Sequence, residues 1–114
     1  MSISFLTDNP TKLLKDFKKK IDDGEVVTWS YDKDGDFTHA PDQWKNKAWL
    51  KPTEEADRLR FNIIGSNKYE LTWTIYSVYH GRFMEAMIRH CRALYTVARS
   101  PSKPTDNDAK PVSD

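Results

Sequence analysis

The chain of 114 residues contains a single cysteine, Cys91, so an internal disulfide bond is impossible. It also lacks any run of about eighteen apolar residues, the length that a membrane-spanning helix requires. The first residues carry neither the basic start nor the apolar core of a secretory signal. These absences exclude a disulfide-stabilised scaffold and a membrane span, and they favour a cytoplasmic protein.

Arginine is missing from the first half of the chain, where every positive charge is a lysine. Residues 22–57 carry ten acidic residues and four lysines, whereas residues 58–99 carry all six arginines. The net charge is nevertheless only +1, because the two halves compensate each other. We expect acidic loops to lie against basic helices and to leave a mixed, solvated surface.

Large apolar side chains are almost absent from residues 100–114, where Val112 stands among three prolines. Such a segment buries too little apolar surface to offset the entropy lost on ordering. The sequence therefore predicts a compact domain over residues 1–99 and a disordered polar tail over residues 100–114.

Helical periodicity is present at both ends of the predicted domain. Near the start, the capping sequence Asp8-Asn9-Pro10 precedes an apolar stripe and predicts a helix over residues 10–23. Near the end, apolar and aromatic residues recur at helical spacing up to about Ala98. That last helix is expected to begin at Ser77, a fair cap, or after Gly81.

Between the helices the sequence favours β-structure. Residues 25–31 are rich in β-branched and aromatic side chains, and residues 58–64 alternate with period two. Residues 47–64 resemble a hairpin with a five-residue loop, and residues 69–75 are expected to form a fourth strand. The prediction is an α+β domain with three or four antiparallel strands and both helices packed on one face.

The acidic stretch of residues 31–44 poses the sharpest chemical question. Asp32, Asp34 and Asp36 match the first three ligand positions of an EF-hand calcium loop. However, Phe37 stands where that loop needs glycine, and Gln43 stands where it needs glutamate. A calcium loop of this type is therefore disfavoured.

A tight turn explains the same stretch more simply. Asp34-Gly35 is a favoured turn pair, because glycine adopts positive φ freely and aspartate tolerates it. We expect a hairpin turn with no metal. The alternative is a metal site or a general base held by a carboxylate, built from Asp32, Asp34, Asp36 and His39.

Two further groups are candidates for ligand binding. Tyr79, His80 and Arg82 cluster near the expected start of the last helix, where N–H groups and a guanidinium could hold an anion. Trp44 lies in a loop and is the tryptophan expected to be exposed, and exposed tryptophans often mark binding surfaces.

These residues support three hypotheses. The leading one is a non-enzymatic binding module without a cofactor, monomeric or homodimeric, that engages a protein partner or a small anionic ligand through the aromatic loop and the last helix. The first alternative is a small metal-dependent or acid–base hydrolase acting on a phosphate ester, with catalytic residues drawn from Asp34, Asp36, His39 and His80. The second is a single-stranded nucleic-acid binder that uses the basic last helix and its tyrosines.

Overall fold

The computed structural model describes residues 2–114, which form a six-stranded sheet and two α-helices. In chain order the elements are β1 (Ser2–Leu6), α1 (Pro10–Asp22), β2 (Trp29–Tyr31), β3 (Phe37–His39), β4 (Ala48–Glu55), β5 (Arg58–Gly65), α2 (Trp73–Cys91), the 3-10 turn η1 (Arg92–Leu94) and β6 (Val97–Arg99). The predicted α+β class is confirmed. The prediction of three or four strands is wrong, because β1 and β6 enlarge the sheet.

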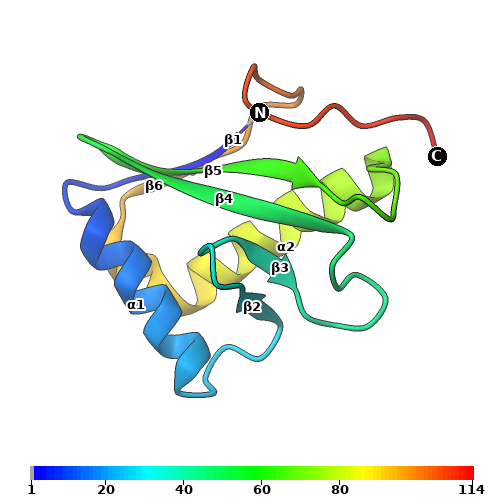
Figure 1. The fold of residues 1–114 in the computed structure, drawn as a ribbon. Helices are drawn as coiled ribbons and strands as arrows, with labels where there is room; N and C mark the ends of the chain where they lie inside the picture. The colour runs from blue at the N-terminus through cyan, green and yellow to red at the C-terminus, as the bar shows by residue number, and fades with distance from the viewer. Residues whose placement is uncertain (1) are drawn as a thin grey trace.

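The sheet has the strand order β2-β3-β4-β5-β1-β6, and every neighbouring pair is antiparallel. Both helices lie on one side of the long strands β4 and β5, while the C-terminal segment runs on the other side (Figure 1). On β4, Ala48 and Leu50 are buried towards the helices. Since side chains alternate along a strand, Trp49 between them points to the opposite face.

Aromatic rings form the centre of the core, and Phe83 of α2 lies among them. Its ring centroid is 4.6–6.1 Å from five other rings, all of them in edge or tilted contact. These rings come from helix α1 and from four strands of the sheet: Phe5, Phe17, Trp29, Phe37 and Phe61. One side chain of α2 therefore contacts every layer of the domain.

Helix α1 ends within one residue of the predicted range. The Asn9 side chain accepts a hydrogen bond from the Lys12 N–H at 3.1 Å, and Pro10 opens the first turn. Leu13 and Phe17 are buried on the core side. Gly24 follows the helix with φ +80°, a conformation that glycine adopts without strain.

The two strands that the sequence did not predict lie together at one edge of the sheet. Ile3 and Phe5 of β1 alternate into the core, and β1 pairs with β5 and with β6. The predicted last helix ends at Cys91 rather than near Ala98, because residues 97–99 pair with β1 instead. The Thr96 N–H donates to the Leu6 carbonyl at 2.8 Å and starts this pairing.

The predicted strand over residues 69–75 is also wrong, since α2 already begins at Trp73. The Thr72 hydroxyl caps the helix by accepting a hydrogen bond from the Ile75 N–H at 3.3 Å. Ile75 and Tyr79 are both buried along the same side of α2. Burial at helical spacing thus outweighs the β-propensity of this segment.

Helix α2 continues through Gly81, although glycine in a helix costs roughly 1 kcal/mol relative to alanine. A Cβ atom built on Gly81 would have no neighbouring atom within 4 Å. No close packing inside the domain therefore requires a glycine at this position.

Both hairpins differ in length from the prediction. The strand expected over residues 25–31 is reduced to Trp29–Tyr31. Strand β4 continues past Pro52 to Glu55, so a two-residue turn replaces the expected five-residue loop. Since β3 pairs with β4 only at Phe37↔Leu50, β4 is an edge strand beyond that point, where proline is tolerated.

Residues 100–114 make specific contacts with the domain. Asp108 is 7% exposed, and its carboxylate accepts hydrogen bonds from the Asn62 amide at 2.8 Å and the Ile63 N–H at 3.2 Å. Further along, the Val112 N–H donates to the Leu71 carbonyl at 2.8 Å. The expectation that this segment is disordered in solution stays a prediction, and the Asp108 contacts provide a way to test it.

Within residues 2–114, no helix combines the length and the apolar character that crossing a bilayer requires.

Candidate ligand-binding site

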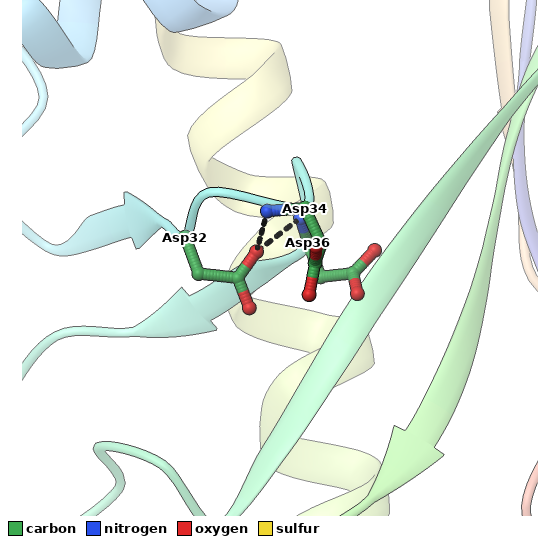
Figure 2. Close-up of side chains that lie close together, drawn as sticks. All are labelled: Asp32, Asp34 and Asp36. Carbon is green, nitrogen blue, oxygen red and sulfur yellow. Dashed lines mark hydrogen bonds between the residues drawn. The ribbon is translucent and has the colours of Figure 1, made fainter.

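The three carboxylates of the acidic stretch lie together in the turn between β2 and β3. One oxygen of Asp32 accepts hydrogen bonds from the N–H groups of Asp34 and Asp36, each at 3.0 Å (Figure 2). Gly35 has φ +83°, and its N–H donates to the Asp32 carbonyl at 3.0 Å. The predicted hairpin turn is thus confirmed, and one Asp32 oxygen holds its backbone in place.

Carboxylate oxygens of Asp32, Asp34 and Asp36 lie within 4.8 Å of one another, a spacing that a cation could bridge. His39 does not join them. It is separated from Asp36 by two strand residues and lies buried with Nδ1 2.7 Å from the Thr28 carbonyl oxygen. The structure therefore offers three exposed or half-buried carboxylates, and not the four-ligand set that includes His39.

Crowding at this turn leads to a prediction about Asp36. Burial raises the pKa of Asp36, and the charges of Asp32 and Asp34 raise it further, while Lys51 opposes them. A carboxyl group whose pKa is higher in the folded than in the unfolded protein lowers the stability of the fold when it is ionised. This loss of stability disappears as the pH falls through the pKa of the folded state. Asp36→Asn should raise Tm at pH 7, and the gain should shrink towards zero as the pH approaches 3.

Thermal unfolding of wild type and Asp36→Asn across this pH range measures the effect, with the loop variant Asp42→Asn as a control. A Tm that falls for Asp36→Asn at pH 7 would contradict the proposed repulsion. A wild-type Tm that rises in millimolar calcium, with no rise in Asp36→Asn, would show that the turn is a cation site.

The two candidate catalytic histidines are both in the interior, in different surroundings. His39 stacks on Trp29 at 4.6 Å, and burial lowers the pKa of its imidazole, with Arg82 lowering it further. His80 stacks on Tyr76 at 4.1 Å, with Nδ1 2.6 Å from the Tyr76 carbonyl oxygen. The carboxylate group in the acidic turn includes neither histidine. These placements do not favour the hydrolase hypothesis.

Burial also makes Cys91 a poor nucleophile. The thiol is 2% exposed, and burial raises the pKa of Cys91 to about 12 even though Lys20 opposes the shift. It therefore stays protonated at neutral pH.

Tyr79 and Trp44, two of the predicted ligand-binding residues, form an internal anchor. Tyr79 is fully buried, and its hydroxyl donates a hydrogen bond to the Trp44 carbonyl. The same hydroxyl lies 3.0 Å from the Thr38 hydroxyl, which accepts a hydrogen bond from the Asn46 N–H at 3.0 Å. The Trp44 ring is partly buried against the core. Both residues thus hold the loop of residues 40–47 in position.

Arg82 is exposed, but it lies well inside α2, because the helix begins at Trp73 and not near Ser77. The first turn of α2 is occupied by the chain itself. The Asp114 carboxylate accepts hydrogen bonds from the Thr74 N–H, at 3.2 Å, and from the Thr74 hydroxyl. The expected pairing of Arg82 with a helix N-terminus therefore does not occur.

A different set of residues forms a surface hollow of about 450 Å³ at the β4–β5 end of the sheet. One wall is the loop of residues 40–47, and the other is the loop that follows β5. Trp49 and Tyr69 supply the aromatic surface, and Tyr69 is 47% exposed. The full lining comprises Lys45, Asn46, Trp49, Gly65, Ser66, Asn67, Lys68 and Tyr69, and we call it the Trp49 pocket.

The charge of the Trp49 pocket is positive. Lys45 and Lys68 line it, and none of its lining residues is acidic. A third lysine, Lys47, places its Nζ atom 5.4 Å from the centre of the Tyr69 ring, in a cation–π contact. Asn46 and Asn67 add amides that can both donate and accept hydrogen bonds. The pocket thus combines two aromatic rings, nearby cations and amides.

The loop wall of the Trp49 pocket is held in place by the Tyr79 anchor. Asn46 has a positive φ of 62°, a conformation that asparagine tolerates better than most residues. Its N–H is fixed by Thr38, and the Lys45 N–H donates to the Pro41 carbonyl at 2.9 Å. Because the loop is ordered before any ligand arrives, binding there loses less entropy.

Sequence reasoning missed this pocket for two reasons. The sequence predicts a strand over residues 69–75, which would place Tyr69 inside the sheet instead of in a loop. The outward direction of Trp49 was available from the alternation of Ala48, Trp49 and Leu50, but nothing in the sequence indicated which loop would lie beside it. The lysine pair at 45 and 47 was the remaining clue.

Comparison with models of known protein families, with curated proteins and with solved structures finds no match to this chain.

Proposed function

We propose that this protein is a binding module, and that the Trp49 pocket binds a ligand carrying both a planar ring and a phosphate, as nucleotides and single-stranded nucleic acids do. The observation that carries this proposal is the convergence of two aromatic rings and two lysines on one acid-free hollow. The proposal keeps the anionic ligand and the aromatic loop of the leading hypothesis and moves the contact from Trp44 to Trp49 and Tyr69.

The rings account for the planar part of the ligand. A base stacked on an aromatic side chain gains about 1–3 kcal/mol with little dependence on sequence. Tyr69 is nearly half exposed, so its ring has a free surface on which to stack. Trp49 is half-buried on the sheet face away from the helices, where packing restricts its movement.

The lysines account for the phosphate. Lys45 and Lys68 come from opposite walls of the pocket, so an anion placed between them attracts both. The ammonium of Lys47 also lies against the Tyr69 ring. Binding should therefore weaken as the salt concentration rises, because contacts between exposed charges are screened.

Titration calorimetry with three probes tests the proposal: AMP, adenosine and inorganic phosphate. AMP should bind more tightly than either of the other two, because it alone engages the rings and the lysines together. Tyr69→Ala should weaken AMP binding by about tenfold, which corresponds to 1.4 kcal/mol of lost stacking. Trp73→Ala is the matched control, because Trp73 is a comparably exposed aromatic residue (42%) outside the pocket.

Equal effects of Tyr69→Ala and Trp73→Ala, or AMP binding no tighter than that of phosphate, would contradict the proposal. A single strand of eight deoxythymidine nucleotides distinguishes the two kinds of ligand that carry both a ring and a phosphate, free nucleotides and single-stranded nucleic acids. If the strand binds more tightly than AMP and its affinity depends more steeply on salt, the natural ligand is a single-stranded nucleic acid. If the strand binds no better than AMP, the ligand is a free nucleotide.

A further inference from the structure

Helix α2 exposes an apolar stripe on the side that faces solvent. Met84 is half-buried, and Ile88, one turn further on, is 48% exposed. Together with Gly81 they lie at three- and four-residue spacing, which places them on one face of the helix. This face has a hollow of about 670 Å³, lined by Gly81, Met84, Glu85, Ile88, Arg89 and Arg92, which we call the α2 groove.

The glycine in the α2 groove makes no close contact within the domain at its Cα. Gly81 lies inside a helix, where alanine is the better residue, and a Cβ atom there would meet nothing within 4 Å. Such a position allows the backbone of another molecule to approach closely. The glycine and the adjacent apolar hollow are two separate observations, and both indicate a docking surface.

Charge around the α2 groove is unbalanced. Arg89 and Arg92 line it together with one carboxylate, Glu85, and Arg82 lines the adjoining hollow that shares Gly81 and Glu85. None of the three arginines forms an ion pair with a carboxylate of residues 2–114. Arg92 donates instead to the backbone carbonyl of Arg89 at 3.0 Å. The rim of the groove is therefore positive and open to an acidic partner.

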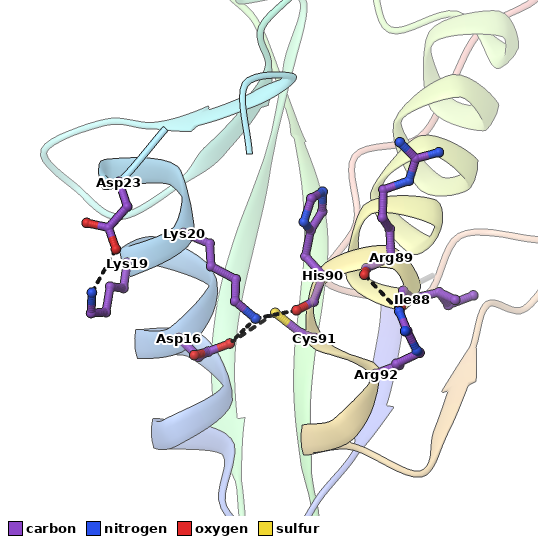
Figure 3. Close-up of polar contacts among 9 residues, drawn as sticks. All are labelled: Asp16, Lys19, Lys20, Asp23, Ile88, Arg89, His90, Cys91 and Arg92. Carbon is purple, nitrogen blue, oxygen red and sulfur yellow. Dashed lines mark hydrogen bonds and ion pairs between the residues drawn. The ribbon is translucent and has the colours of Figure 1, made fainter. Parts of the chain in front are cut away.

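The opposite side of α2 packs on the domain. Figure 3 shows Asp16 and Lys20 of α1 facing the end of α2, with the Lys20 ammonium 2.9 Å from Asp16 and also bonded to the His90 carbonyl. Ile88 points away from α1 in the same view. The α2 groove is thus separate from the packing of the two helices.

We infer that the α2 groove docks an acidic amphipathic helix of a partner protein, with its apolar side chains on Met84 and Ile88 and its carboxylates beside the arginines. In this binding mode the apolar face of the partner helix lies in the groove, and charge complementarity determines which partner binds. A second copy of the chain does not fit, because two α2 grooves brought together would juxtapose two sets of arginines. Gly81 lets the partner backbone lie close to α2.

The test uses a fluorescein-labelled helical peptide with leucines at positions i, i+3, i+4 and i+7 and glutamates on either side of them. A second peptide has lysines in place of the glutamates. Fluorescence anisotropy with the full chain should show binding of the acidic peptide, which weakens as salt is added, and at least about tenfold weaker binding of the basic one. Arg89→Glu should reduce acidic-peptide binding by about tenfold, whereas Lys15→Glu on α1 should leave it unchanged.

Gly81→Gln provides an independent check on the role of the glycine. It should raise Tm, because glutamine favours the helix and meets no obstruction, yet it should weaken binding of the acidic peptide. Equal binding of both peptides, or unchanged binding by Arg89→Glu and by Gly81→Gln, would overturn the inference. So would a dimer in sedimentation equilibrium that dissociates in Gly81→Gln, because it would identify a second copy of the chain as the occupant.

Discussion

Replacing Phe83 by alanine should lower the free energy of unfolding by about 3–5 kcal/mol, the largest effect of any single change considered for this protein. Phe83 is fully buried, and its ring lies 4.6 Å from Phe61 and 4.9 Å from Trp29. Truncation removes ring contacts to helix α1 and to four strands at once, and it leaves a cavity that the surrounding rings can fill only in part.

Urea unfolding monitored by tryptophan fluorescence measures this loss, with Ile88→Ala as the control. Ile88 lies on the same helix but is 48% exposed, so its truncation should change the stability by no more than about 0.5 kcal/mol. Similar losses for the two variants would show that the ring cluster around Phe83 does not organise the core.

Replacing Asp108 by alanine should cost about 2–3 kcal/mol, although the residue lies in the segment that the sequence predicts to be disordered. Its carboxylate accepts hydrogen bonds from the Asn62 amide, the Ile63 N–H and the Thr105 N–H. Removing a charged acceptor leaves donors without a partner at a buried site, and each such hydrogen bond contributes about 1.5–3 kcal/mol. The expected total is smaller than the sum of these bonds, because water can reach some of the donors once the carboxylate is removed.

Asp106→Ala is the matched control, because Asp106 lies in the same segment but is exposed. Thermal unfolding should separate the two variants by several degrees. If both leave Tm unchanged, residues 100–114 are a dispensable disordered tail, as the composition of the segment predicts.

The parts of the fold that were predicted correctly have local causes. The Asn9-Pro10 start and the Leu13–Phe17 stripe define α1, and Asp34-Gly35 defines the β2–β3 turn. Each depends on residues within a few positions of one another, so the sequence alone contains the information. The alternation of residues 58–64 likewise predicted β5 almost to the residue.

The errors in the fold came from pairings between distant segments. Residues 97–99 leave the helical path because β1 offers them a free edge, and Ile3 and Phe5 contribute to the core only when β5 lies beside them. The start of α2 was displaced because Thr72 and Ile75 are β-branched, whereas burial of Ile75 requires the helix. Tertiary contacts, and not local propensity, determine the secondary structure of these segments.

In the candidate site, too, local sequence predicts some features and tertiary packing determines the others. Sequence patterning singled out aromatic residues and the loop near Trp44, and that loop does form one wall of the Trp49 pocket. The sequence could not show which of these residues would contact a ligand, because that depends on which of them the fold buries. Tyr79 and His80 lie in the interior, whereas Tyr69 faces solvent. Which aromatic ring remains exposed depends on the packing of the whole domain.

The most direct test of the central claim is a titration of the 15N-labelled protein with AMP, followed through the indole N–H signals of its four tryptophans. Trp49 lines the pocket, Trp29 is 1% exposed in the core, and Trp73 is exposed elsewhere. We expect a saturable shift of the Trp49 indole signal, together with the backbone signals of Asn46 and Tyr69, while Trp29 and Trp73 remain unchanged. No shift at Trp49, or an equal shift at Trp73, would contradict a specific ligand site in the Trp49 pocket.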